Sequence, residues 1–134
     1  MANPLTEEQA RQLLAQAHAA AANSISPYSK FPVGAALLST DGSVTTGCNI
    51  ESPSILQEIC AERLTMFKAL SDGHRSFSHM AIATPLKPAI WPCGLCRQML
   101  IEFAPELMVI VEDENGKILQ QPVAELLPDA FIEP

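Results

Sequence analysis

The sequence predicts an α/β fold in which helices cover a mixed sheet of about five strands. Short apolar runs bounded by turn residues alternate with segments of helical periodicity along the 134 residues. The expected order is helix, hairpin, helix, strand, helix, strand, strand, helix. Alternation in the middle of this order requires at least one parallel pair joined by a right-handed crossover. The length and the apolar content of 48% suit a single domain over residues 1–134.

The first part of the chain predicts a helix and then a hairpin. Residues 6–22 begin with a capping threonine, carry two acidic residues in the first turn and repeat apolar residues at helical spacing. Residues 23–32 are rich in turn formers and lead to a short buried strand at 33–39. An Asp-Gly pair at 41–42 is typical of a hairpin turn, so residues 43–50 are the returning strand.

The rest of the chain alternates between the two kinds of element. We expect a loop at 51–58, a helix at 59–70 that stops near Gly73, a strand at 77–84, a loop at 85–92, a helix at 94–103, a strand at 107–112, a turn at 113–116, a short strand at 117–120 and a helical turn at 123–127. Ligands of such sheets bind beyond the strand ends, where the crossover helices begin. The cysteine motifs of this chain fall at those helix starts.

Charge and apolar patterning exclude several classes of function. The net charge is −7 and the basic residues are scattered singly, which argues against a polynucleotide partner. No run approaches the roughly 20 apolar residues of a membrane span. The first 20 residues resemble neither a secretory nor a mitochondrial leader, so we expect a cytoplasmic protein. In that reducing compartment the four cysteines are more often metal ligands than disulfides.

Three of the cysteines have the spacing of a catalytic zinc site. Cys60 begins one predicted helix, and Cys93 and Cys96 form a CxxC pair at the start of another. Helix N-termini favour thiolate over thiol, and three thiolates leave the fourth tetrahedral position of zinc free for chemistry. Cys48 lies in a predicted strand nearby. It is an alternative fourth ligand, although a single strand cysteine is usually a small buried apolar residue.

The residues beside these cysteines suggest the reaction. Glu62 lies two positions after Cys60, where a carboxylate can take a proton from water, deliver it to a ring nitrogen and protonate a leaving amine. A non-ligand glutamate ahead of a Pro-Cys-x-x-Cys pair is the signature of zinc deaminases. Arg63 and Arg97 each follow a cysteine, and their guanidinium groups can offset the negative charge of three thiolates. The alternative is a pair of exposed surface arginines.

Several segments, spread along nearly the whole chain, resemble the tetrameric cytidine deaminase family. They are YSKFPVGAAL at 28–37, GCNIE at 47–51, CAER at 60–63, PCGLCRQ at 92–98 and ELLPDAF at 125–131. The resemblance implies a three-layer α-β-α cytidine deaminase-like fold, a homotetramer and one Zn²⁺ per subunit. It also implies hydrolytic deamination of cytidine or deoxycytidine to the uridine counterpart, with ammonia release, in pyrimidine salvage.

The same resemblance assigns roles to individual residues. It implies that Phe31 lines the nucleoside pocket and that Asn49 and Glu51 hydrogen-bond the ribose 3′-hydroxyl. The Ala61 N–H is expected to hold the pyrimidine carbonyl oxygen, and Phe131 to reach the site of a neighbouring subunit. The resemblance also makes Glu62 the proton shuttle and the three cysteines the zinc ligands. From composition alone, both phenylalanines would more often be packing residues.

The chain departs from the family pattern beside the inferred pocket. Ser52 and Pro53 replace the usual residues after Glu51, Glu58 adds a carboxylate, and Trp91 stands where a small residue is usual. These changes predict an altered or narrowed base preference. An alternative substrate is a modified pyrimidine nucleoside or aminoheterocycle, as in the similar blasticidin S deaminases. A non-catalytic alternative is a binding protein stabilised by a closed four-ligand zinc site.

Overall fold

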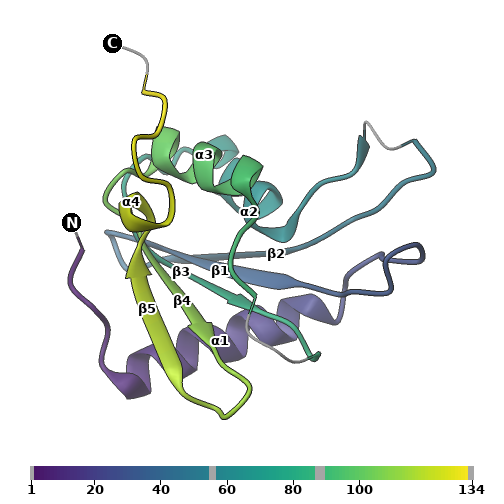
Figure 1. Cartoon of the computed structure of the whole chain (residues 1–134), viewed down its shortest axis with the longest axis horizontal. Helices are drawn as coiled ribbons and strands as arrows, with labels where there is room; N and C mark the ends of the chain where they lie inside the picture. Colours follow the sequence, from purple (N-terminus) through teal and green to yellow (C-terminus); the bar gives the residue numbers. More distant parts are fainter. Residues whose placement is uncertain (1, 55–56, 87–89, 133–134) are drawn as a thin grey trace.

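A five-stranded mixed sheet lies between helices in the computed structural model, which describes residues 2–54, 57–86 and 90–132. The elements are α1 (Glu7–Ala21), β1 (Gly34–Ser39), β2 (Val44–Cys48), α2 (Ala61–Ser71), β3 (Phe77–Ala83), α3 (Gly94–Phe103), β4 (Met108–Glu112), β5 (Ile118–Pro122) and α4 (Val123–Leu126). The strand order is β2-β1-β3-β4-β5, with β3 and β4 parallel and the other pairs antiparallel. Figure 1 shows α1 on one face of the sheet and α2 with α3 on the other. The predicted α-β-α layering is confirmed.

Strand alternation divides the apolar side chains between these two faces. In β1, Ala35 and Leu37 pack on the side of α2 and α3, whereas Ala36 packs against α1. The same alternation recurs in the two strands that follow in the sheet, since successive side chains of a strand point to opposite faces. On the α2 and α3 side it contributes Met80, Ile82, Val109 and Val111, and on the α1 side Ala81, Ala83 and Ile110.

Helix α1 is fixed at both its start and its middle. Thr6 and Gln9 form a capping box: the Gln9 N–H donates to Thr6 Oγ1 at 3.2 Å, and the Thr6 N–H donates to Gln9 Oε1 at 3.0 Å. Further along, the helix backbone lies against Gly34, where a Cβ atom would come within 1.9 Å of the Ala17 carbonyl oxygen. This close approach seats α1 on the sheet and requires glycine at position 34.

Some element boundaries differ from the sequence prediction. The helix expected from residue 59 begins at Ala61, because Ile59 pairs instead with Ile50 in an isolated bridge. It ends at Ser71, close to Gly73, which has φ +96°. The short strand expected at 117–120 runs over Ile118–Pro122 as β5. Of the expected loops at 51–58 and 85–92, residues 55–56 and 87–89 lie outside the described part of the chain.

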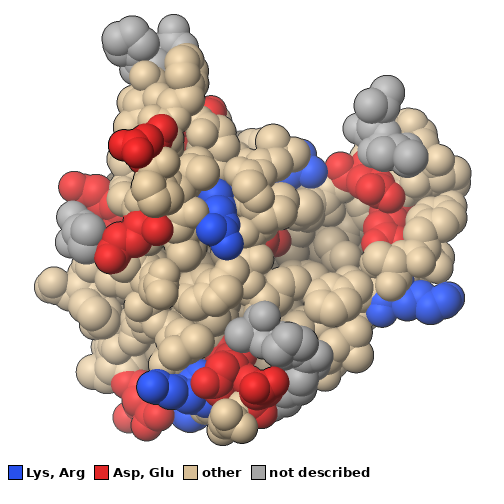
Figure 2. Space-filling view, viewed as in Figure 1, with Lys and Arg blue, Asp and Glu red and all other residues tan. Residues whose placement is uncertain are grey.

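Charged side chains are dispersed over the surface. Figure 2 shows Lys and Arg side chains interspersed with acidic ones on the face that it draws. Across residues 2–54, 57–86 and 90–132, no helix combines the length and the apolar character needed to cross a bilayer.

Candidate metal centre and active site

Two helix starts bring three cysteine sulfurs together. Cys60 is the N-cap of α2 and Cys93 the N-cap of α3, both with extended backbone, and Cys96 lies in the first turn of α3. Their Sγ atoms all lie within 4.8 Å of one another. A tetrahedral zinc with Zn–S bonds of about 2.3 Å holds its sulfurs about 3.8 Å apart, so the cluster needs little adjustment to bind the ion. Three thiolates are a donor set that zinc prefers.

The protonation state of one sulfur already favours metal binding. A hydrogen bond from the Cys96 thiol, reinforced by the Arg63 guanidinium, lowers the pKa of Cys60 to about 5. The same hydrogen bond raises the pKa of Cys96 above its ordinary value. Cys60 and Cys96 therefore share one proton. A bound zinc ion would replace that proton, because thiolate is the form that binds metal.

Cys48 stands apart from this cluster. It is buried in β2 opposite Gly34, and burial raises the pKa of its thiol. Within the described residues, the group of metal-ligating side chains at this site comprises Cys60, Cys93 and Cys96 alone. The arrangement is that of an open three-ligand site, and the closed four-ligand alternative finds no fourth partner in the described part of the chain.

Glu62 lies beside the sulfurs with a buried side chain. It follows Ala61 in the first turn of α2, and only 5% of its surface is exposed. Burial raises the pKa of Glu62 to about 7, with the nearby Cys60 charge adding to the increase. A carboxyl group with a pKa near neutrality can both accept and return a proton at physiological pH.

One pocket of about 290 Å³ lies at the start of α2 and α3. Cys60, Cys93, Ala61 and Glu62 are among its lining residues. Its remaining described lining is mostly apolar and aromatic, and consists of Phe31, Val33, Ile90, Trp91, Ser29 and Asn49. No Lys, Arg or His is among these lining residues. The pocket therefore suits a flat, uncharged ring with a few polar groups.

The two candidate arginines have different surroundings. Arg63 lies against the cluster: desolvation lowers its pKa, but the hydrogen bond and charge of Cys60 outweigh this and raise it. Arg97 instead donates from Nε to the Pro92 carbonyl and from Nη1 to the Leu126 carbonyl, each at 2.7 Å. Two N–H donors of Arg97 that we expected near the cysteine sulfurs therefore bind backbone carbonyl oxygens instead. Arg97 holds the segment before Cys93 against the end of α4.

Asn49 fixes the loop that carries Phe31. Its Oδ1 accepts hydrogen bonds from Ser24 Oγ at 2.5 Å and from the Val33 N–H at 2.9 Å. Its Nδ2 donates to the Phe31 carbonyl at 2.9 Å. Asn49 therefore lies on the pocket wall and at the same time holds both ends of the segment that places the aromatic ring.

Glu51 caps a turn of the same loop. One carboxylate oxygen accepts from the Tyr28 N–H at 2.9 Å and the Ser29 N–H at 3.1 Å, and the other accepts from the Ser29 hydroxyl. These bonds, led by that hydroxyl, hold the pKa of Glu51 below its usual value. Glu51 lines a smaller neighbouring cavity of about 140 Å³ together with Glu58 and Arg63.

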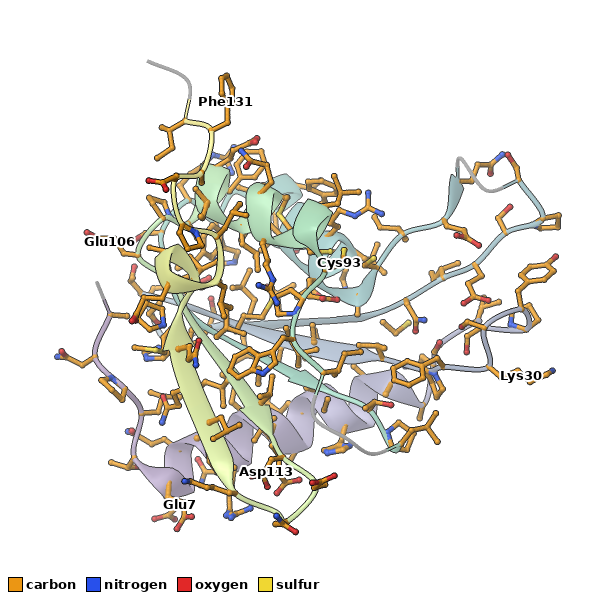
Figure 3. The ribbon with its side chains drawn as sticks, in the orientation of Figure 1. Glu7, Lys30, Cys93, Glu106, Asp113 and Phe131 are labelled. Atoms are coloured by element: carbon orange, nitrogen blue, oxygen red, sulfur yellow. The ribbon has the colours of Figure 1, made fainter. Side chains whose placement is uncertain are left out.

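Phe131 lies away from the pocket of its own chain. Its side chain is 70% exposed, and Figure 3 shows it on the C-terminal tail beyond α3, whereas Cys93 lies at the start of that helix. Gln98 Nε2 donates to the Phe131 carbonyl at 2.8 Å, which ties the tail to α3. Phe131 lines a different cavity of about 400 Å³ with Ile101 and other apolar residues.

Sequence reasoning missed three lining residues, Ser29, Val33 and Ile90. A signal existed for the first two, because both lie in the YSKFPV segment that carries Phe31. Ile90 gave none, because nothing in its neighbouring residues indicates that it lines the pocket. Of the residues that depart from the family pattern, Trp91 lines the pocket and Glu58 the neighbouring cavity, while Ser52 and Pro53 have partly to fully exposed positions.

Comparisons with known proteins agree with this geometry. Residues 7–112 match the family model for the cytidine and deoxycytidylate deaminase zinc-binding region. A cytidine deaminase of Sporosarcina psychrophila is 46% identical over 121 residues, which cover 90% of this chain and 89% of that protein. The crystal structure of cytidine deaminase from Burkholderia pseudomallei is similar with a TM-score of 0.86 and 40% identity, covering 95% of this chain and 100% of that one.

A more distant relative carries a different name. A blasticidin-S deaminase of Bacillus cereus is 30% identical over 107 residues, which cover 74% of this chain and 76% of that protein. The family model and the more similar relatives each span most of the chain, and the three-cysteine cluster lies within the matched region. The chain therefore belongs to the cytidine and deoxycytidylate deaminase zinc-binding family.

Proposed function

We propose that this protein is a zinc-dependent hydrolase that deaminates cytidine or deoxycytidine to the uridine counterpart and releases ammonia. The observation that carries the proposal is a cluster of three cysteine sulfurs, two of whose residues, Cys60 and Cys93, line one pocket of about 290 Å³ together with the buried Glu62. The family membership and the relatives named cytidine deaminase support the same activity.

In this mechanism Cys60, Cys93 and Cys96 hold the zinc ion. When bound, zinc supplies the Lewis acidity that activates water for attack on C4 of the pyrimidine. Glu62 would take one proton of that water and pass it to the ring nitrogen. It would then carry the second proton, from the hydroxyl added at C4, to the departing amine, which leaves as ammonia. Its burial supports this role, because a desolvated carboxyl with a pKa raised to about 7 exchanges protons readily in both directions.

The pocket wall supports binding of a nucleoside without phosphate. Phe31 and Trp91 line the pocket and would pack against the base, and the N–H of Ala61, in the first turn of α2, would meet the pyrimidine carbonyl oxygen. A phosphate would need Lys or Arg beside it, and the described lining has neither. Cytidine and deoxycytidine therefore fit better than their monophosphates. Arg63, next to the thiolates, offsets the charge of the cluster.

The protein is proposed to act as a cytoplasmic homotetramer in pyrimidine salvage. The exposure of Phe131 on the tail supports assembly, because an aromatic side chain with 70% of its surface exposed is available to a second copy. In such an assembly Phe131 would close the pocket of a neighbouring subunit. Sedimentation velocity and a Phe131→Ala variant test this: the wild type is expected to sediment as a tetramer, and the variant to lose affinity for the nucleoside.

A second candidate substrate is a larger aminopyrimidine nucleoside of the blasticidin S kind. The cavity lined by Glu51 and Glu58 adjoins the main pocket, since both cavities include Asn49 and Cys60. The carboxylates of Glu51 and Glu58 outnumber the Arg63 guanidinium in this lining, and the net negative charge would suit a cationic substituent of the substrate. The relative named blasticidin-S deaminase supports including this compound in any test.

The test is ammonia release by the zinc-loaded protein from a panel of substrates. The panel contains cytidine, deoxycytidine, cytosine, cytidine monophosphate and blasticidin S. The proposal expects turnover of the two plain nucleosides, at least about tenfold lower kcat/KM for the monophosphate, and loss of activity when a chelator removes zinc. Preference for blasticidin S would favour the second candidate, and no turnover of any panel member would refute deamination of these substrates.

A further inference from the structure

Arg97 holds the backbone on both sides of the zinc ligand Cys93. The Arg97 N–H donates to the Cys93 carbonyl at 2.8 Å, and Arg97 Nε donates to the Pro92 carbonyl at 2.7 Å. These two carbonyls belong to the peptide groups that flank the Cα atom of Cys93. Because each peptide group is planar, holding both of them restricts the φ and ψ angles of Cys93 and the direction of its Cα–Cβ bond.

Cys93 is the zinc ligand that has the least support from packing. Cys96 is buried in the first turn of α3, and Cys60 is partly exposed but follows Ile59, which pairs with Ile50. Cys93 is exposed, lies at the N-cap of α3 and makes no capping hydrogen bond with its side chain. The alignment of its sulfur therefore depends mainly on how its backbone is held.

The guanidinium of Arg97 is itself fixed at its other end by α4. Its Nη1 donates to the Leu126 carbonyl at 2.7 Å, 29 residues further along the chain. Helix α4 in turn is joined to the core, because Val123 is fully buried and its N–H donates to the Leu107 carbonyl at 2.9 Å. The loop before α3 is therefore connected to the hydrophobic core through Arg97.

The shape of the arginine side chain suits this connection. The planar guanidinium holds Nε and Nη1 in a fixed relation, so one rigid group sets the Pro92 carbonyl relative to the Leu126 carbonyl. A lysine would bring the same charge on a flexible stem without that fixed geometry. The contacts of Arg97 thus depend on direction as well as on charge.

We propose that Arg97 is a positioning residue that holds the sulfur of Cys93 in its zinc-binding direction before the metal binds. It acts through the backbone of Pro92 and Cys93, with α4 as its fixed support. Because Cys93 is ordered when the chain folds, zinc binding does not have to supply that loss of conformational entropy, and the affinity for zinc is higher. The inference rests on the zinc centre of the proposed function and not on the identity of the substrate.

The test is the zinc affinity of Arg97→Met and Cys93→Ala, singly and together, in competition with chelators of graded strength. Arg97→Met removes both side-chain hydrogen bonds, so we expect the zinc affinity to fall by about tenfold, within the usual range for residues that orient metal ligands. If Arg97 acts through Cys93, the same substitution should change the affinity by less than about twofold once Cys93 is alanine.

Two results of this comparison would overturn the proposal. An equal loss of affinity in the presence and absence of the Cys93 thiol would mean that Arg97 supports the fold or the charge of the whole cluster. An unchanged affinity in Arg97→Met would mean that it does not support the ligand.

Arg97→Lys separates direction from charge. It keeps the positive charge without the planar group, and we expect its zinc affinity to stay at least about fivefold below that of the wild type. Full recovery by lysine would mean that only the charge matters, which overturns a positioning role.

Arg75→Met is the matched control. Arg75 also donates to two backbone carbonyls, those of Leu70 and His74, at 2.7 and 2.8 Å, but beyond the C-terminal end of α2. Its replacement should leave the zinc affinity within about twofold of the wild type. A loss equal to that of Arg97→Met would show that the effect is not specific to the residue beside Cys93, and would overturn the proposal.

Solvent exchange of the arginine Nε–H groups, followed by NMR in the zinc-free wild type, tests the same inference without a substitution. The Nε–H of Arg97 is bonded to Pro92, whereas the bonds of Arg75 come from Nη1. We therefore expect the Arg97 Nε–H to exchange at least about tenfold more slowly than that of Arg75. Protection that appears only after zinc is added would overturn the claim that the contact precedes the metal.

These measurements distinguish a failure of this inference from a failure of the proposed function. A wild type that binds zinc but deaminates nothing refutes the activity, and Arg97 is then judged from the zinc affinities alone. A wild type that binds no zinc overturns the metal centre together with the role of Arg97.

Discussion

Replacing Gly34 by alanine should be among the most damaging single changes to this fold. A Cβ at position 34 would lie 1.9 Å from the Ala17 carbonyl oxygen and 2.6 Å from the Ala21 nitrogen, and both obstacles are helix backbone. Ordinary contact begins near 3.4 Å, so α1 must move away from β1 by about 1.5 Å. Such a gap removes a large part of the van der Waals attraction between the sheet and the buried face of α1, which includes Leu13 and Leu14. We expect the free energy of unfolding to fall by at least about 3 kcal/mol.

Urea unfolding at fixed protein and zinc concentration measures this cost. With a slope of about 2 kcal/mol/M, a loss of about 3 kcal/mol lowers the midpoint by about 1.5 M. Gly94→Ala is the matched control, because residue 94 opens helix α3 and, among the described residues, no atom other than those of its chain neighbours and its own helix backbone lies within 4 Å of the alanine methyl position. Alanine there should be neutral or stabilise by about 0.5 kcal/mol. A midpoint for Gly34→Ala within about 0.3 M of wild type would refute the close packing of α1.

Three further predictions concern the site and its loop. Cys96→Ala should lose most of its zinc while Cys48→Ala keeps one ion per chain, and equal metal contents would refute the three-cysteine assignment. Arg63→Gln should weaken zinc binding by about 10- to 100-fold in competition with a chelator, and unchanged affinity would show that the guanidinium does not support the thiolates. The loop contacts of Glu51 hold its pKa below the usual value of 4.5. These contacts therefore stabilise the folded protein above pH 4.5, and this stability is lost as the pH falls through the lower pKa of the folded state. Acid unfolding should therefore be less steep in Glu51→Gln, and identical profiles would contradict the contact.

Local patterns in the sequence predict most of the fold. The helix expected at 94–103 is found at Gly94–Phe103, and the Asp-Gly pair at 41–42 turns the hairpin between β1 and β2. These elements depend on signals a few residues apart: helical spacing, a strand period of two and turn residues. The start of α2 lies two residues later than its segment predicts. The pairing that holds Ile59 involves Ile50, a partner that its own segment does not reveal.

The metal cluster is also predictable, because helix starts at one edge of a sheet meet in space. Cys60 and Cys93 lie at two such starts, and the structure brings their sulfurs and that of Cys96 together. The direction of Arg97 is not predictable from its neighbours. Its Nη1 reaches the Leu126 carbonyl, 29 residues away, which becomes available only because α4 is short and ends there.

The substrate-facing loop is the least predictable part. The hydrogen bond of Glu51 to the sugar stays a prediction, but the contacts that hold its carboxylate, from two N–H groups and one hydroxyl of its own chain, were not predicted. Such contacts join residues more than 20 positions apart, which local sequence patterns do not reveal. The proposed role of Phe131 likewise depends on a second copy, because its exposed ring is not among the residues that line the pocket of its own chain.

The central claim is that a three-thiolate zinc centre and Glu62 together perform the deamination. The most direct measurement is the zinc content and the cytidine turnover of Glu62→Gln, determined side by side with the wild type. Glutamine preserves the shape of the buried side chain but cannot carry the proton, so the variant should retain one zinc ion per chain and lose at least about 10³-fold in kcat. A zinc-loaded Glu62→Gln protein that deaminates cytidine within about tenfold of the wild-type rate would contradict the account.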